Sequence, residues 1–486
     1  MDKVTVIAFF FEPTFGGAST RSTEIVRMLK KITREVVVIT TFPQYPSGKI
    51  EDPKYRGITD DICIERDDAA TIIRIRLPPL PFRGLLTRFF LFSIFGLKVI
   101  LNLGKIGQYV KGSNVIYSHT PQVVSMYLGW FLSKLFGADH IADIQDLLSL
   151  ELRDWNRRGI LARIFALMAL LGERLALKLV KRASTATISL KIATKKIFGK
   201  NNKNEVVWIP TPVALEHFQE RDKYEARDYV INKLKLVPKE FMDKKIIVYT
   251  GFFGIYQGLT DLVKVIARIR DKLDNTCFIL MGDGETKRKV MSLIKKLKLD
   301  DVIYVGKKVP RELVPWIISM ADMCLLPLKG RTSKLLALPT KFYEYVACSR
   351  PILAVSSGDV RAIIEKFKVG LVMDSIQELE KRAEELERLL SNDKVLEEYC
   401  RRAKVLARWL FLENNIITRF FRILNKKGYI RLENLSRYQK RSTYTHQAPS
   451  DIYQSQALFQ IYLLALRPVQ PSRPLPAIRW DSTRLS

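Results

Sequence analysis

Short β-branched runs alternate with helical patterns along this 486-residue chain, and the alternation occurs in two series. The first series begins at residues 4–11 and ends at residues 206–210, and the second begins at residues 244–251 and ends at residues 370–374. Strands that alternate with helices form parallel sheets, because each helix carries the chain back before the next strand starts. The pattern therefore predicts an α/β protein with two parallel-sheet domains, for which the chain is long enough.

Changes of composition mark the expected domain boundaries. Two prolines, Pro210 and Pro212, precede a charged stretch at residues 216–240, which is typical of an exit from a domain. The last part of the chain is rich in proline and poor in acidic residues, so we expect it to be irregular or disordered. The predicted segments are a first domain at 1–212, a linker at 213–240, a second domain at 241–393, a helical segment at 394–425 and a tail at 426–486.

The composition narrows the class of protein. A content of 47% hydrophobic and 27% charged residues is too apolar for a disordered chain and too charged for a polytopic membrane protein. The five cysteines are scattered, so neither a disulfide framework nor a metal site is expected, and a cytoplasmic location fits best. The net charge of +30 suits an anionic partner, but no nucleic-acid-binding signature accompanies it, and we expect no nucleic acid.

Two apolar segments with cationic residues raise the question of a membrane. Residues 85–103 are long enough to span a bilayer, but Arg88 and Lys98 leave too short an uncharged stretch between them. Residues 160–182 repeat the combination of an apolar body and basic residues. Such helices suit shallow insertion into an anionic leaflet, and the alternative is a pair of buried helices in a large domain. We predict peripheral contact with an anionic membrane surface.

Glycines follow the first strand of each predicted sheet, where ligands of parallel sheets bind. Gly16 and Gly17 stand ahead of a helix, and Gly251 and Gly254 occupy the corresponding loop of the second series. Adjacent glycines let backbone N–H groups approach a phosphate or a sugar, although an ordinary tight turn explains them about as well. Arg21, one turn into the first helix, could reach back to a phosphate or lie on the surface.

A lysine opens a predicted helix in the second domain, where a cation is unfavourable. Lys341 stands in the first turn, which carries partial positive charge, and Glu344 follows it on the same face. A bound anion would explain the lysine, and the glutamate would then face a hydroxyl group. The alternative is a surface helix, capped by Thr340, whose charged residues are solvated.

The motifs taken together resemble the family-4 retaining glycosyltransferases of the two-Rossmann (GT-B) type. The resemblance extends over about residues 1–425 and is most specific in the second domain, in GDGE, VIYVG, ADMCLLPL and PTKFYEYVACSRPIL. The segments NVIYSHTPQVVSMYLGWFLSK and HIADIQDLLSLE are most similar to bacterial-type N-acetylfucosaminyl and related transferases that assemble lipid-linked surface glycans.

The resemblance implies roles for particular residues. A lysine at the position of Lys341 binds the donor diphosphate, a glutamate at the position of Glu344 binds the ribose, and the Gly16–Gly17 loop lies near the sugar. The chain departs from the wider family at Leu336, where a further glutamate is usual. It also has Phe252 and Gln257 where the family has a basic pair. These departures leave the donor sugar open, and we interpret them as specificity.

Residues of the first domain complete the predicted site. His119 ends a strand and could hydrogen-bond the sugar or the developing charge, although a loop histidine with a structural partner is an equal alternative. Asp143 and Asp146 follow the next strand and could orient acceptor hydroxyls. The resemblance favours Asp146, which could equally be a helix cap. The predicted catalytic residues are thus Lys341, His119 and Asp146.

The resemblance implies a glycosyltransferase that moves a sugar from a nucleoside diphosphate sugar, expected to be UDP-linked, to a lipid-linked or glycan acceptor. We expect no cofactor and no metal, because no DxD-like loop is evident. A peripheral position on the inner face of the cell membrane fits the charge and the apolar helices. Two alternatives are a nucleotide-sugar epimerase of the same fold and a non-catalytic subunit that binds sugar nucleotides or membranes.

Overall fold

The structure is a computed structural model of the chain. The residues that it describes are 3–14, 16–67, 70–82, 84–120, 123–147, 160–198, 204–215, 217–273 and 275–411, with 416, 419–420 and 423–424. Every element described below belongs to the unit Met1–Leu435. The predicted tail at 426–486 and part of the predicted helical segment lie outside the described residues.

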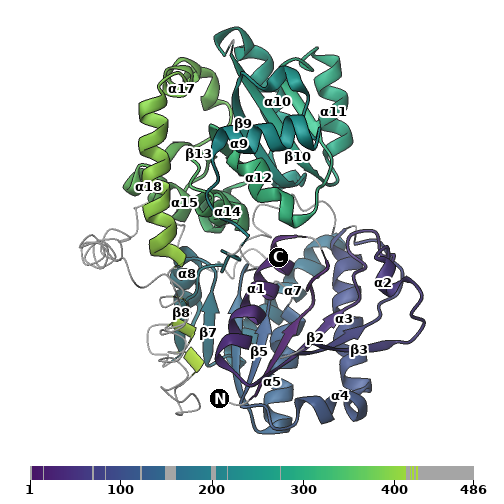
Figure 1. Ribbon diagram of the computed structural model, residues 1–486. Coiled ribbons are helices and arrows are strands. Elements are labelled where there is room, and N and C mark those ends of the chain that lie inside the picture. The colour runs from purple at the N-terminus through teal and green to yellow at the C-terminus, as the bar shows by residue number, and fades with distance from the viewer. Residues whose placement is uncertain are drawn as a thin grey trace. The chain divides into compact units, whose positions relative to one another are not determined.

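An eight-stranded sheet, in the order β3-β4-β2-β1-β5-β6-β7-β8, forms the first Rossmann-like domain (Figure 1). All neighbouring strands pair in parallel except β3 and β4, which form an antiparallel pair at one edge. The strands are β1 Lys3–Ala8, β2 Glu35–Thr41, β3 Ile62–Asp67, β4 Ala70–Ile75, β5 Val115–His119, β6 Asp139–Ile144, β7 Arg182–Thr185 and β8 Glu205–Trp208.

Helices cover both faces of this sheet, and the central strands are therefore continuous apolar runs. α3, α4 and α5 share one hydrophobic core with β1, β2, β4 and β5, while α1 packs against β1 and β2. α5 and α7 share a second core with β6, β7 and β8. The helices are α1 Gly17–Ile32, α2 Pro53–Arg56, α3 Leu85–Leu101, α4 Leu103–Val110, α5 Val123–Phe136, α7 Ile160–Leu179 and α8 Ile188–Phe198.

A six-stranded, wholly parallel sheet in the order β11-β10-β9-β12-β13-β14 forms the second domain. Its strands are β9 Lys245–Phe252, β10 Thr276–Asp283, β11 Ile303–Gly306, β12 Met323–Pro327, β13 Ile352–Val355 and β14 Gly370–Met373. Its helices are α9 Lys223–Arg227, α10 Leu259–Ile269, α11 Lys287–Lys296, α12 Val314–Ser319, α13 Arg331–Leu336, α14 Thr340–Ala347, α15 Asp359–Phe367, α16 Glu378–Lys381, α17 Ala383–Leu390 and α18 Asp393–Phe411. The prediction of two parallel-sheet Rossmann-like domains is confirmed.

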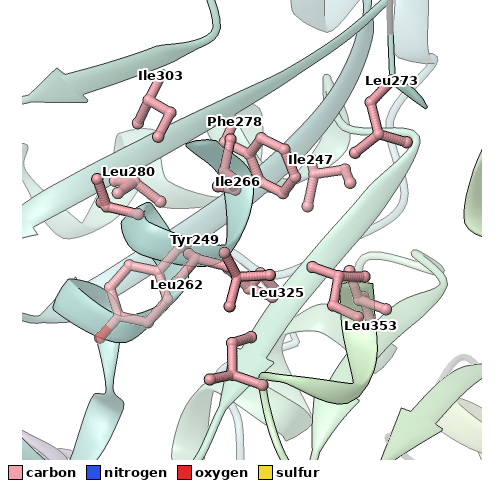
Figure 2. Close-up of a cluster of buried hydrophobic side chains, with 14 of the residues drawn as sticks. Ile247, Tyr249, Leu262, Ile266, Leu273, Phe278, Leu280, Ile303, Leu325 and Leu353 are labelled. Atoms are coloured by element: carbon pink, nitrogen blue, oxygen red, sulfur yellow. The ribbon is translucent and has the colours of Figure 1, made fainter. Parts of the chain in front are cut away.

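The core of the second domain lies between its sheet and α10, α11 and α17. Figure 2 shows Ile247 and Tyr249 of β9 beside Leu262 and Ile266 of α10. Tyr249 is the polar member of the labelled set, and its hydroxyl oxygen lies at the edge of the cluster. A buried tyrosine usually finds a partner for its hydroxyl, and the partner here belongs to the candidate site.

Two local features of the first sheet differ from what the sequence pattern indicates. The β3 strand was not predicted, because an edge strand paired on one side carries charged side chains and shows no apolar run. The run of residues 184–190, STATISL, has the pattern of a strand, but the strand ends at Thr185, and Ile188 begins α8. Two contacts fix this helix start: the hydroxyl of Thr187 accepts from the Leu190 N–H at 3.0 Å, and the carboxylate of Asp359 accepts from the Ile188 N–H at 2.7 Å.

The segment predicted as a linker is folded in part. α9 packs against α12, and a single π-helical turn, Asp228–Lys233, continues it. Arg227 donates to the Asp322 carboxylate at 2.6 Å, and Lys223 pairs with the same carboxylate at 2.9 Å. Charged residues in this stretch therefore hold it against the second domain, which composition alone could not show.

Candidate active site

The helix α14 carries the lysine and the glutamate that the sequence singles out. All residues from Lys341 to Ala347 are buried, so the alternative of a solvated surface helix is excluded. Pro339 precedes the helix with extended backbone geometry, and no side chain caps the first N–H groups of the helix. The first turn therefore keeps its partial positive charge, and a lysine within it needs a compensating partner.

Lys341 is 9% exposed, and neutral acceptors hold its ammonium group. Its Nζ donates to the hydroxyl of Tyr249 at 2.8 Å and to Oε1 of Gln257 at 2.9 Å. Burial lowers the pKa of Lys341 to about 7, and the nearby charge of Glu344 opposes the lowering. A buried lysine without a carboxylate in contact is costly, which is typical of a functional site.

Glu344 lies one turn after Lys341 and is 7% exposed. Its Oε1 accepts from Nη1 of Arg311 at 3.1 Å, and the guanidinium of Arg311 stacks on the ring of Phe218, 4.8 Å from its centroid. Nη2 of Arg311 is buried and has no hydrogen-bond partner among the described residues. A ligand hydroxyl at Glu344 would therefore meet an arginine as well as a carboxylate.

The glycine loop of the first domain lies beside the start of α14. A Cβ atom on Gly17 would lie 3.8 Å from Oγ1 of Thr340, so the first residues of α1 and α14 approach each other. Gly16 has a φ of 134°, which an L side chain rarely adopts, and no side chain caps the α1 helix. Two helix N-termini with uncapped N–H groups thus lie close together, an arrangement that favours an anion.

The glycines of the second loop shape the space around Lys341. Gly251 has a φ of 130°, and a Cβ atom there would lie 3.2 Å from Nζ of Lys341. Gly254 follows Phe253, and a Cβ atom there would lie 3.2 Å from the ring of Phe252. Gly251 is thus required by the close approach of the lysine, whereas a donor-binding role for either glycine stays a prediction.

His119 and Arg21 meet at the buried carboxylate of Asp143. Nδ1 of His119 lies 2.8 Å from Oδ2 of Asp143, and Arg21 donates to both oxygens of Asp143, at 3.0 and 2.8 Å. All three side chains are at most 2% exposed. Burial would raise the pKa of Asp143, but the charge of Arg21 and the hydrogen bonds from His119 and Arg21 hold it well below its ordinary value.

The predicted residues of the first domain therefore differ in their contacts and in their exposure to solvent. Arg21 is neither on the surface nor free, because Asp143 and the Thr211 hydroxyl occupy its guanidinium. His119 has an orienting carboxylate on Nδ1, and its Nε2 lies 3.2 Å from the Ala18 carbonyl oxygen in the first turn of α1. Asp146 is exposed, so it could face an acceptor, and its role stays a prediction.

Sequence reasoning missed Tyr249 and Arg311 as members of the site and treated Gln257 only as a departure from the family pattern. Their contacts with α14 join residues up to 92 positions apart, for which a single sequence carries no signal. Leu336, the other departure, packs against the hydrophobic cluster of α5, α7 and α8. Among the described residues, no three His, Cys, Asp or Glu side chains come together as a metal site would require.

Comparison with known proteins identifies the class. Residues 231–405 match the family model of the glycosyl transferases group 1. The glycosyl transferase WcaI of Escherichia coli (strain K12), assigned to colanic acid biosynthesis, is 25% identical over 356 residues, which cover 71% of this chain and 81% of WcaI.

Solved structures share the fold. A sucrose-phosphate synthase from Thermosynechococcus elongatus has a TM-score of 0.65 at 16% identity, with 88% of this chain and 99% of that chain covered. Anabaena Alr3699/HepE, solved in complex with UDP and glucose, has a TM-score of 0.61 at 13% identity, with 88% and 100% covered. The two parallel-sheet domains thus form a GT-B fold. Residues 231–405 thus match a group 1 glycosyl transferase domain, and the protein is a glycosyltransferase, an enzyme that transfers a sugar from a nucleotide-sugar donor.

Proposed function

We propose that the enzyme transfers a sugar, with retention of configuration and without a metal, from a UDP-linked donor to a lipid-linked glycan acceptor at the inner face of the cell membrane. The observation that carries the proposal is the buried pair on α14. Lys341 and Glu344 lie one turn apart beside the uncapped start of α1, where a diphosphate and the ribose next to it would each find a partner.

The chemistry follows from the charge that must be stabilised. The bond between the sugar C1 and the diphosphate oxygen breaks with its electron pair on that oxygen, and the acceptor oxygen bonds to C1 on the same face. The acceptor proton passes to the departing diphosphate. Lys341 and the N–H groups of two helix starts stabilise the diphosphate charge best where water is excluded, and 9% exposure of Lys341 meets that condition.

Three observations support particular substrates. HepE binds UDP in a fold that this chain shares, which supports a uridine donor. WcaI is assigned to colanic acid biosynthesis, and the sequence segments around His119 and Asp146 resemble surface-glycan transferases, including those for N-acetylfucosamine. Leu336 leaves no carboxylate at a position where the wider family has one, which favours a donor sugar with fewer hydroxyl groups to bind.

The test uses the purified full-length protein with a panel of UDP, GDP and dTDP sugars. We expect calorimetric binding and turnover with a UDP sugar on a lipid-linked glycan acceptor, and loss of both in Lys341→Ala and Glu344→Ala. The exposed residues Lys289 and Glu397 provide matched controls, whose alanine variants should retain activity. Turnover with GDP sugars only would overturn the proposed UDP-linked donor. A product with inverted anomeric configuration would overturn the proposed retention.

The membrane part of the proposal rests on an apolar surface of the first domain. α3 and α7 both pack against α5, and each carries a stripe of exposed apolar side chains. On α3 these are Leu86, Phe89, Phe90, Leu97, Ile100 and Leu101. On α7 they are Ile164, Leu167, Met168, Leu171 and Leu175. Exposed cations accompany both stripes, among them Arg88, Arg174 and Lys178.

Apolar stripes with cationic neighbours suit shallow insertion into an anionic leaflet. Among the described helices, no single one is long and apolar enough to cross a bilayer; α3 and α4 reach the criterion only as a pair, bent by 79°. We expect flotation with anionic liposomes that weakens with salt and is lost in Leu171→Glu. Val405→Glu, which adds the same charge at a residue 47% exposed on α18, should float like the wild type. Absence of flotation, or flotation indifferent to lipid charge, would refute the electrostatic docking.

A further inference from the structure

The ammonium group of Lys341 has three N–H donors, and the protein occupies two of them. The acceptors are the hydroxyl of Tyr249 at 2.8 Å and Oε1 of Gln257 at 2.9 Å. Neither acceptor carries a charge. The lysine is thus fixed in direction, while its positive charge is not neutralised by direct contact and one N–H remains for a ligand.

The hydroxyl oxygen of Tyr249 is oriented to accept a hydrogen bond from Lys341. Its own hydroxyl proton is committed to the carbonyl oxygen of Phe252 at 2.6 Å, so the lone pairs of the oxygen face Lys341. The ring is fixed in the core of the second domain (Figure 2), and Nζ of Lys341 lies 4.0 Å from its centroid. The tyrosine therefore contacts the cation with both its oxygen and its ring face.

The loop after β9 completes the arrangement. Gln257 ends a 3-10 turn, Ile255–Gln257, that begins directly after Gly254. Gly251 leaves room for the ammonium group, since a Cβ there would approach Nζ to 3.2 Å. The loop after β9 thus holds a cation that α14 supplies.

We propose that Tyr249 and Gln257 are positioning residues that direct the third N–H of Lys341 at the donor diphosphate. This inference rests on the proposed donor site. Among the described residues, Glu344 on α14 acts on the pKa of Lys341 and is itself paired with Arg311 at 3.1 Å. Glu285 accepts from the Ile255 N–H, in the turn that carries Gln257, at 3.2 Å. Loss of either acceptor leaves the ammonium group less supported, and its proton should then be lost at lower pH.

The experiment measures binding of UDP and of a UDP sugar to the full-length protein from pH 6 to pH 8.5, by calorimetry. In the wild type, affinity should weaken as the pH rises through the titration of Lys341. In Tyr249→Phe and Gln257→Leu, each of which removes one acceptor, the midpoint should move to lower pH by about one pH unit. Affinity at pH 7.5 should then fall about tenfold. Gln257→Glu keeps an acceptor and adds a negative charge, so its midpoint should move to higher pH.

Gln257→Lys separates this inference from the simplest alternative. If the loop merely lacks a cation, a lysine there should tighten donor binding. If Gln257 positions Lys341, a second ammonium at this distance should repel the first and weaken binding. Tyr229→Phe and Gln108→Leu, which remove the same groups elsewhere in the chain, should bind the donor like the wild type.

The outcomes distinguish the positioning role of Tyr249 and Gln257 from the existence of the donor site. Unchanged midpoints in Tyr249→Phe and Gln257→Leu, or tighter binding by Gln257→Lys, would overturn the positioning role while leaving the donor site intact. Failure of the wild type to bind any nucleoside diphosphate would instead overturn the proposed function. Gln257 is only half-buried, so we expect its variants to fold and to give a wild-type circular dichroism spectrum. The Gln257 variants therefore test the inference even if Tyr249→Phe does not fold.

Discussion

Replacement of Lys341 by methionine should stabilise the protein while it removes donor binding. The lysine is 9% exposed, and its partners in direct contact are neutral, so the folded chain carries a desolvated charge. Methionine fills a similar volume without charge. The Lys341 side chain would then contribute to ligand binding while it destabilises the folded protein, as is common at functional sites.

The magnitude follows from the pKa. A lowering from the ordinary value of 10.5 to about 7 corresponds to about 5 kcal/mol against the charged form. The substitution also leaves Tyr249 and Gln257 without a donor, and each unsatisfied acceptor costs about 1 kcal/mol or more. We therefore expect a net gain of about 2–3 kcal/mol in the free energy of unfolding near pH 7.

The stability difference between Lys341→Met and the wild type should depend on pH. Between about pH 7 and pH 10.5 the unfolded chain holds the Lys341 proton and the folded chain does not, so wild-type stability from this group rises with pH across that window. The advantage of Lys341→Met should be largest at or below pH 7 and should shrink towards pH 10.

Urea denaturation of both proteins at pH 6.5 and pH 9.5 measures this difference. Lys289→Met, at an exposed site on α11, serves as the control and should show no such pH-dependent gain. A destabilised Lys341→Met protein at pH 6.5, or a gain that does not decline at pH 9.5, would refute the reasoning.

Further substitutions test the other buried features. Arg21→Met should destabilise the protein by about 3–5 kcal/mol in urea denaturation, because the buried carboxylate of Asp143 loses its bidentate partner; a loss below 1 kcal/mol would contradict that account. Gly282→Ala should lower the melting temperature strongly, since its φ is 148° and the added Cβ would lie 1.9 Å from a backbone oxygen. Gly172→Ala, in the interior of α7 with nothing within 4 Å of the added atom, should instead raise stability by up to about 1 kcal/mol, and equal effects of the two substitutions would be inconsistent with this explanation.

The fold was predictable because the sequence patterns that indicate it are local. Runs of β-branched residues alternate with helical periods, and the parallel order of the sheets follows from that alternation. The edge strand β3 and the start of α8 escaped prediction for the opposite reason. Partners elsewhere in the chain determine both: β4 for the strand, and Asp359, 171 positions away, for the helix.

Sequence by itself determined which residues of α14 could hold a nucleotide. Lys341 and Glu344 share a face because a helix turns every 3.6 residues, and the lysine is conspicuous because helix starts repel cations. Only the tertiary structure decided what surrounds them. Tyr249 comes from β9, Gln257 from the 3-10 turn after it, and Arg311 from another 3-10 turn, Arg311–Leu313. Arg21 pairs with Asp143 across 122 positions. Such contacts form because the sheets bring together the ends of strands that are far apart in the sequence. The spacing of residues along the chain does not indicate which of these ends will be neighbours.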